Sequence, residues 1–510
     1  MEETPSREKE KIDEIPGKDD LSNRDVARLS KLMEKEAEKA RAEELEEPYN
    51  ITGTTFTIEE NAVKTDSTYW SRIRPIPLTP EEQTTVRKRD SITGISRPGP
   101  EGDSIFSPVR KQQPFKSILL GGTRNFSTGK GRIRYGGLID PDMLNFNTVD
   151  GWSYAQDFRF QYKIDSLRTF RTYLTAGYAF NRKAPLIKLQ SNLFYAPLRR
   201  GNLQLKLDYR SADFNDLSGL SNFTNMAYSL LYRENHQKLY EKINVSLYNG
   251  IDLTNGLAVE VSTDLGIQNR LANITDFSLL FRNSKDYTLN LPDSTMREDN
   301  PYLADRKKFS CDLKLKYTPR QYYVLRSGRK HMRNSKWPTF MIQYQQSIPL
   351  EDMTWSDYSF ISASVTYDAG IALLSNLNAK ATGGYFIKNE MMHFSDFNHF
   401  KTLLLLFDFN GLDNGYKLLN YYEGSTNHYW VEGHVKITSP YMLLKLLPWF
   451  SERMWTESAE ISYLKTDNVN HYMQAGYSIN DILFLMDMGI YIGFEDLRYR
   501  GIGFRVNLKF

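Results

Sequence analysis

The last eleven residues of the chain, 500–510, read RGIGFRVNLKF. Successive side chains of a β-strand point to opposite faces, so this stretch predicts a strand with one apolar and one polar face. The apolar face holds Ile502, Phe504, Val506, Leu508 and Phe510. Its length exceeds the roughly 5–6 residues of an average strand in a soluble protein.

The same alternation recurs upstream, and residues 484–494 also sustain it for eleven residues. A soluble sandwich buries the apolar face of such a strand, whereas a membrane barrel turns that face to lipid around a wet lumen. A barrel strand needs about 9–11 residues to cross the bilayer. Aromatic residues recur at the ends of the runs, as in Tyr162, Tyr209 and Tyr317, which is typical of an interfacial girdle. Strand length and ring placement both favour the barrel.

The sequence therefore predicts an all-β fold, an antiparallel transmembrane outer-membrane β-barrel of about 14–16 strands over residues 115–510. Residues 393–427 do not alternate, and we expect them to fold into the lumen as a plug or inward loop. Residues 1–50 carry 16 acidic and 10 basic residues and predict a charged helical or disordered extension. Residues 51–114 are rich in proline and predict a linker with short ordered elements.

The composition excludes several classes of protein. The 65 basic and 62 acidic residues nearly balance, so nothing favours nucleic-acid binding. The longest apolar run, residues 403–407, is far too short for a membrane-spanning helix. The single cysteine, Cys311, excludes a disulfide framework. The first 30 residues contain no secretory signal, which predicts a mature, truncated or split-gene form.

Several phrases of the sequence carry a family resemblance: SDFNHF at 395–400, YYEGSTN at 421–427, EGH at 432–434 and the stretch 69–91. With them, the chain resembles a Bacteroidota outer-membrane family with a domain of unknown function, usually preceded by a carboxypeptidase-regulatory-like domain. The resemblance implies an outer-membrane location and a barrel, and no substrate or reaction. The final strand, through Phe504, Val506, Leu508 and Phe510, also resembles the signal that hands such barrels to the barrel-assembly machinery.

Polar residues with potential for chemistry gather toward the C-terminus, namely Asp396, His399, Glu423, Ser425, Asn427, Glu432 and His434. The even spacing of Glu432 and His434 would place both on one face of a strand. A metal site or a serine nucleophile is conceivable there, but no ligand spacing matches a known motif. The alternative is a hydrogen-bonded network that holds an inward loop, and we favour it. We accordingly predict no catalytic, cofactor-binding or metal-binding residues.

The leading hypothesis is a barrel that acts in envelope transport or assembly, with outer-membrane lipid and the assembly machinery as partners. Two alternatives stay open. One is an outer-membrane enzyme that uses the polar cluster. The other is a structural anchor whose residues 1–114 bind a periplasmic partner.

Overall fold

The computed structural model describes Glu82 and residues 119–509, apart from short gaps at 127–128, 140–142, 218, 282–284, 294–295, 352, 373, 409–410, 413–414, 441 and 445–454. The extension predicted for 1–50, nearly all of the linker predicted for 51–114, and Phe510 lie outside the described residues. Within the described part, no helix is long and apolar enough to cross a membrane.

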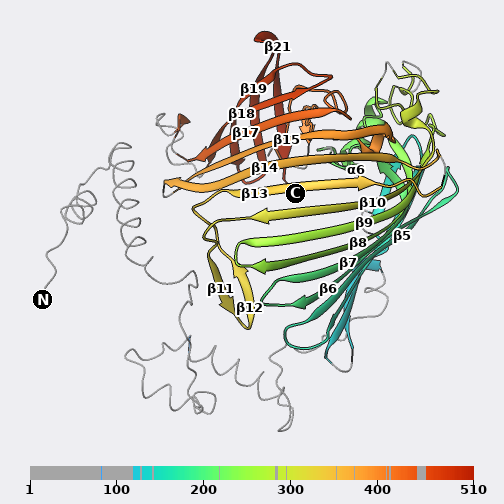
Figure 1. Cartoon of the computed structure of the whole chain (residues 1–510). Helices are drawn as coiled ribbons and strands as arrows, with labels where there is room; N and C mark the ends of the chain where they lie inside the picture. The colour runs from blue at the N-terminus through green and yellow to red at the C-terminus, as the bar shows by residue number, and fades with distance from the viewer. Residues whose placement is uncertain are drawn as a thin grey trace, which may run out of the picture.

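Nineteen strands form a single large sheet (Figure 1). Its first nine are β1 (Gly121–Asn125), β2 (Gly131–Gly136), β3 (Leu144–Asn147), β4 (Gly151–Lys163), β5 (Thr169–Ala179), β6 (Ala184–Ala196), β7 (Gly201–Asp213), β8 (Leu239–Thr254) and β9 (Leu257–Arg270). The other ten are β10 (Arg306–Tyr317), β13 (Thr339–Ser347), β14 (Asp357–Ala372), β15 (Ser375–Met391), β16 (Phe407–Asp408), β17 (Tyr429–Ser439), β18 (Thr456–Thr466), β19 (Tyr472–Ile482), β20 (Met486–Glu495) and β21 (Arg498–Leu508). A separate hairpin pairs β11 (Tyr323–Arg326) with β12 (Arg329–Met332).

Strands that follow one another along the chain pair antiparallel through most of the sheet. The sheet has more strands than the 14–16 expected, because the short strands β1, β3 and β16 pair with parts of longer neighbours. Sequence patterning misses such strands, since two to five residues are too few to display a period. The predicted antiparallel, nearly all-β architecture is confirmed.

The long strands match the length expected for crossing a bilayer, and β8, β14 and β15 are longer still, at 16, 16 and 17 residues. Tight turns join many of them. Asp496 and Leu497, between β20 and β21, both have positive φ, at 50° and 64°. This is the geometry of a two-residue hairpin turn whose twist suits the flanking strands. The run predicted at 484–494 begins two residues before β20, because Phe484 lies in a turn with φ 61°.

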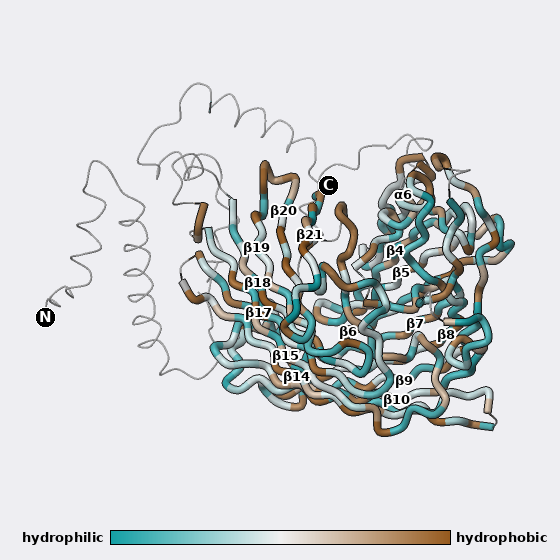
Figure 2. Tube along the Cα trace, turned by 90° about the horizontal axis from the view of Figure 1, so that it is seen from above, coloured by the Kyte–Doolittle hydropathy of each residue, from teal (hydrophilic) through white to brown (hydrophobic). Residues whose placement is uncertain are grey.

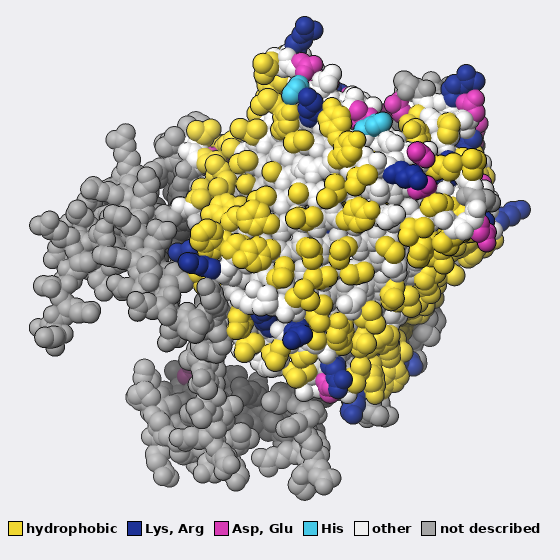
Figure 3. Space-filling model, in the orientation of Figure 1, with side chains coloured by type: hydrophobic (Ala, Val, Ile, Leu, Met, Phe, Trp, Pro, Cys, Tyr) yellow, Lys and Arg dark blue, Asp and Glu magenta, His cyan; other side chains and the backbone are white. Residues whose placement is uncertain are grey.

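The sheet exposes apolar side chains on its outer face and buries polar side chains on its inner face, which is the reverse of a soluble protein. On β20 and β21 the apolar Ile490, Ile502 and Phe504 are exposed on the outer face, at 49%, 59% and 47%. The polar Asp487 and Asn507 on the inner face are buried. Figure 3 shows apolar side chains spread broadly over the visible outer face, with charged side chains gathered toward its upper and lower margins. The alternation therefore separates an apolar exterior from a polar interior.

From β1 onward, the described helical structure lies in the connections between strands. Helix α6 (Asn222–Tyr232) follows β7, with Ser221 as its N-cap and Arg233 ending it in the left-handed conformation. The 3-10 turns η3 (Pro301–Leu303) and η4 (Phe394–Asp396) precede β10 and follow β15. Because antiparallel strands alternate in direction, the long connections 214–238, 271–305 and 392–428 emerge at the same end of the sheet.

The sheet curls into a deep trough, and other parts of the chain lie within its curve (Figure 2). Among the described strands, no ladder joins β21 to β1 or β2. The free edge of β21 instead pairs in parallel with β16, through Phe407 opposite Val506. Val506, which belongs to the predicted assembly signal, is buried beside this pairing, whereas Phe504 of the same signal is exposed.

Candidate functional site

We call residues 393–427 the inward segment, and its described part lies within the curve of the sheet. Many of its described side chains are buried, and those of His393, Tyr416, Lys417 and Leu419 are at 0% exposure. The segment supplies residues to both apolar clusters of the protein, one with Phe214 and Tyr240 and the other with Tyr358 and Trp430. The segment is buried because it packs against the inner face of the sheet.

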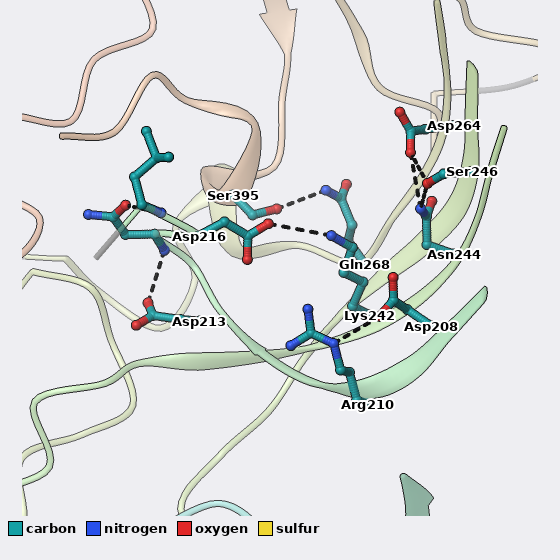
Figure 4. Close-up of polar contacts among 12 residues, drawn as sticks. Asp208, Arg210, Asp213, Asp216, Lys242, Asn244, Ser246, Asp264, Gln268 and Ser395 are labelled. Carbon is teal, nitrogen blue, oxygen red and sulfur yellow. Dashed lines mark hydrogen bonds and ion pairs between the residues drawn. The ribbon is translucent and has the colours of Figure 1, made fainter. Parts of the chain in front are cut away.

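The first half of the sheet holds the start of the inward segment through polar side chains. The Lys308 ammonium of β10 lies 2.7 Å from the Asp396 carboxylate. Gln268 of β9 donates to the Ser395 hydroxyl at 2.8 Å and to Asp396 at 3.1 Å (Figure 4 shows the contact with Ser395). Burial alone raises the pKa of Asp396, but Lys308 and the hydrogen bonds outweigh it, so this pKa lies below its usual value. Asp396 is therefore an ionised, buried anchor.

The last strands hold the middle of the segment. The Arg505 guanidinium of β21 donates to the carbonyl oxygen of Leu403 at 2.9 Å and also to that of Lys417. The buried Lys417 ammonium lies 3.2 Å from Glu460 of β18. The Arg505 guanidinium thus provides hydrogen bonds to two main-chain carbonyl oxygens that are not paired in a strand ladder. The inward segment is thus attached to both arms of the trough.

His399 and Ser425 are the one pair of predicted site residues in direct hydrogen-bond contact within the segment. The Ser425 hydroxyl lies 2.7 Å from His399 Nδ1, and His399 Nε2 lies 3.0 Å from the Phe394 carbonyl oxygen. A carbonyl oxygen only accepts, so Nε2 carries the proton and Nδ1 accepts from Ser425. Burial lowers the pKa of His399 to about 4. A neutral histidine beside a serine hydroxyl is the arrangement of a base and a nucleophile, but both are buried, at 6% and 3% exposure.

The other predicted residues fall into separate groups. Glu423 pairs with Arg500 of β21, and Asn427 donates to the Tyr302 hydroxyl at 3.2 Å. Glu432 and His434 lie together on β17, with 3.7 Å between His434 Nε2 and the Glu432 carboxylate.

Around this β17 pair, Lys380 lies 2.9 Å from Glu432, and Ser462 lies 2.9 Å from His434 Nδ1. Within the described residues, no three His, Cys, Asp or Glu side chains are grouped so as to hold a metal ion. The predicted cluster is therefore several small networks.

Sequence reasoning missed the residues that anchor the segment, notably Gln268, Lys308 and Arg505. Each occupies a polar position in an alternating strand, and the sequence pattern does not distinguish it from the many other residues that face the lumen. Only Arg505 could have been singled out from the sequence, because it is a charged residue in the final strand between the apolar Phe504 and Val506.

A polar cavity of about 640 Å³ lies on the inner face of the first strands. Its lining includes charged residues of both signs, Arg134, Asp150, Asp157, Arg159, Lys188, Arg210, Asp213 and Asp216. Figure 4 shows the charge pairs on one side of it, with Arg210 against Asp208 at 2.9 Å and Asp216 against Lys242 at 3.5 Å.

The cavity adjoins the inward segment. Asp213 of the cavity lining accepts a hydrogen bond from the Tyr422 hydroxyl at 2.7 Å. Asn215, another lining residue, donates to the carbonyl oxygen of Phe400 at 2.8 Å. The inward segment is therefore hydrogen-bonded to two residues of the cavity wall.

Comparison with solved structures finds outer-membrane proteins of low identity. BamA from Haemophilus ducreyi lacking POTRA domains 1-3 is 9% identical with a TM-score of 0.39, over 76% of this chain and 74% of that chain. Salmonella typhi OmpF in complex with daunomycin is 11% identical with a TM-score of 0.29, over 69% and 86%. Escherichia coli Wzi, an outer membrane protein involved in group 1 capsule assembly, is 8% identical with a TM-score of 0.32, over 76% and 80%.

The search of curated proteins finds no match. A protein family does match, over residues 115–479, which is more than half of the chain and runs from before β1 into β19. The chain therefore belongs to the family described as "Family of unknown function (DUF5686) C-terminal domain".

Proposed function

We propose that this protein is an integral outer-membrane β-barrel that passes polar solutes along its lumen, with the inward segment as the plug. The observation that carries the proposal is the reversed distribution of side chains, apolar outside and polar inside. Exposed strands that present Ile490, Ile502 and Phe504 to water would form an apolar surface far larger than a monomeric soluble protein normally exposes. In a bilayer the same surface contacts lipid.

Passage of solutes is supported by the interior. The inner face carries ionisable side chains and a polar cavity, which a purely structural anchor does not require. The inward segment is attached by hydrogen bonds and ion pairs, through Asp396 on one arm and Leu403 on the other. The segment also packs its apolar side chains into both clusters, so we expect the native plug to stay in place and the native protein to conduct weakly.

The membrane part of the proposal is tested by refolding the full chain into detergent and comparing boiled and unboiled samples on a gel. We expect the unboiled protein to migrate faster, and to float with liposomes after reconstitution. Protein that stays soluble and monomeric without detergent would overturn the proposal.

The transport part is tested by conductance in planar bilayers. We expect low conductance for the native protein and higher conductance for Arg505→Gln, which frees the segment from β21. Arg498→Gln, an exposed position at the start of the same strand, is the matched control and should behave as the native protein. If Arg505→Gln keeps its barrel mobility and still passes no ions, the transport function is wrong and an anchor or assembly role replaces it.

A further inference from the structure

Two arginines stand directly opposite each other on the wall of the polar cavity. In the register of β2 and β4, Arg134 pairs with Arg159, and both side chains line the cavity. Like charges at directly opposite positions of a sheet repel and destabilise it. Such a pair is sustained more easily when an anion lies between the two groups.

A third cation, Lys188 of β6, lines the same cavity. It lies on one rung with Thr175 and Asp157, and Thr175 occupies the strand between them. Within the described residues, Arg134, Arg159 and Lys188 make no side-chain hydrogen bond and no ion pair. Three cations therefore face one cavity without a direct ion pair among the described residues.

The carboxylates of the cavity contact two kinds of group, a cation for Asp150 and Asp216 and a neutral hydroxyl for Asp157 and Asp213. Asp150 pairs with the buried Arg182 at 2.7 Å, and Asp216 faces Lys242. Asp157 accepts from the Thr175 hydroxyl at 2.6 Å, and Asp213 accepts from Tyr422. Arg210, the fourth cation, is held by Asp208. A neutral hydroxyl does not cancel the charge of a carboxylate, so Asp157 and Asp213 stay negative. Arg134, Arg159 and Lys188 against these two carboxylates leave the cavity with an excess of one positive charge.

We propose that this cavity binds a phosphate group, held between Arg134 and Arg159 with Lys188 as the third cation. A guanidinium presents two parallel N–H donors that match the geometry of phosphate oxygens, and a lysine adds a point charge. The cavity volume of about 640 Å³ lies within the range of small-molecule sites, so it has room for the rest of a phosphorylated solute. The inference rests on the proposed function, because it names the class of solute for that lumen.

The test is a calorimetric titration of the full chain, folded in detergent, with inorganic phosphate and with glycerol 3-phosphate at constant ionic strength. We expect saturable binding to the native protein, and a loss of about tenfold or more in affinity for Arg134→Gln/Arg159→Gln. Arg132→Gln is the matched control. It lies two residues away on β2, its side chain donates to Gln161, and it does not line the cavity. Its affinity should stay within about twofold of the native value.

Folding is checked by the mobility shift of the unboiled protein. If the shift persists and phosphate does not bind, or binds the double variant equally well, this inference is wrong while the barrel remains. If the shift itself is absent, the proposed function fails.

A phospholipid headgroup shares the phosphate chemistry, and vesicles of phosphatidylcholine with and without phosphatidic acid separate the two sources. Glycerol 3-phosphate binding that is equal in both vesicles supports a soluble ligand. Binding that phosphatidic acid abolishes supports a lipid headgroup in the same site.

Discussion

The Lys308 ammonium of β10 lies 2.7 Å from the Asp396 carboxylate of the inward segment, and Asp396 is almost fully buried. The two residues are 88 positions apart, so the contact ties a strand of the sheet to the chain that fills its interior. A buried ion pair is costly to break on one side, because the remaining charge is left without a partner.

We therefore expect Lys308→Met to destabilise the folded protein by about 3–5 kcal/mol. The double variant Lys308→Met/Asp396→Leu should be less destabilised, since it leaves no unpaired buried charge. Urea unfolding in detergent micelles, followed by tryptophan fluorescence, measures both. A single variant that unfolds at the native urea concentration would show that the pair does not anchor the segment.

Acid should weaken the protein through its buried histidines. Burial lowers the pKa of both His393 and His399 from 6.5 to about 4. Below pH 6.5 the unfolded chain takes up protons that the folded chain refuses, so stability is complete above pH 6.5 and falls as the pH drops toward 4. Each histidine contributes a loss of about 3 kcal/mol at most.

The measurement is urea unfolding at pH 7.5, 6 and 4.5, with His399→Gln as the comparison. This variant should be less stable at pH 7.5, because the Ser425 and Phe394 contacts change. Its further loss of stability on acidification should be smaller than that of the native protein. An equal loss in both proteins would assign the acid sensitivity to other groups.

Removing the Arg505 guanidinium should loosen the middle of the inward segment. Arg505→Gln takes a charged donor from the carbonyls of Leu403 and Lys417, at a cost of about 1–3 kcal/mol for each unsatisfied group. Limited proteolysis in detergent should then cut within residues 403–417 faster than in the native protein. Arg498→Gln should leave the cleavage rate unchanged, and equal rates in the two variants would contradict the role of Arg505.

Lysine on the outer face distinguishes lipid from water. Ile502 and Ile490 are already exposed, so Ile502→Lys or Ile490→Lys would change the stability of a soluble protein by less than about 0.5 kcal/mol. In a bilayer the same changes near the midplane cost about 2–4 kcal/mol. Folding yield into phosphatidylcholine vesicles should fall for both.

Leu497→Lys provides the control, because Leu497 lies in the β20–β21 turn and is 84% exposed. A lysine there would lie near the membrane surface and should be tolerated. Equal folding yields for all three variants would argue against a lipid-facing sheet.

The sequence determined the class of fold and the orientation of its faces. Apolar residues at every second position from 486 to 494 and from 502 to 508 specify which side chains share a face, because the strand period is a local property of the backbone. The absence of that alternation in 393–427 likewise singled out a segment of different character. Both are read from neighbouring residues.

The tertiary structure alone decided which polar residues meet. His399 meets Ser425 rather than Asp396, Asp396 meets Lys308, and Arg505 reaches Leu403 across 102 positions of the chain. The same holds for Arg134 and Arg159, whose opposition depends on strand register. Such contacts are set by the packing of segments distant in sequence, and an alternating pattern gives every inward residue the same appearance until the sheet curls and the inward segment fills it.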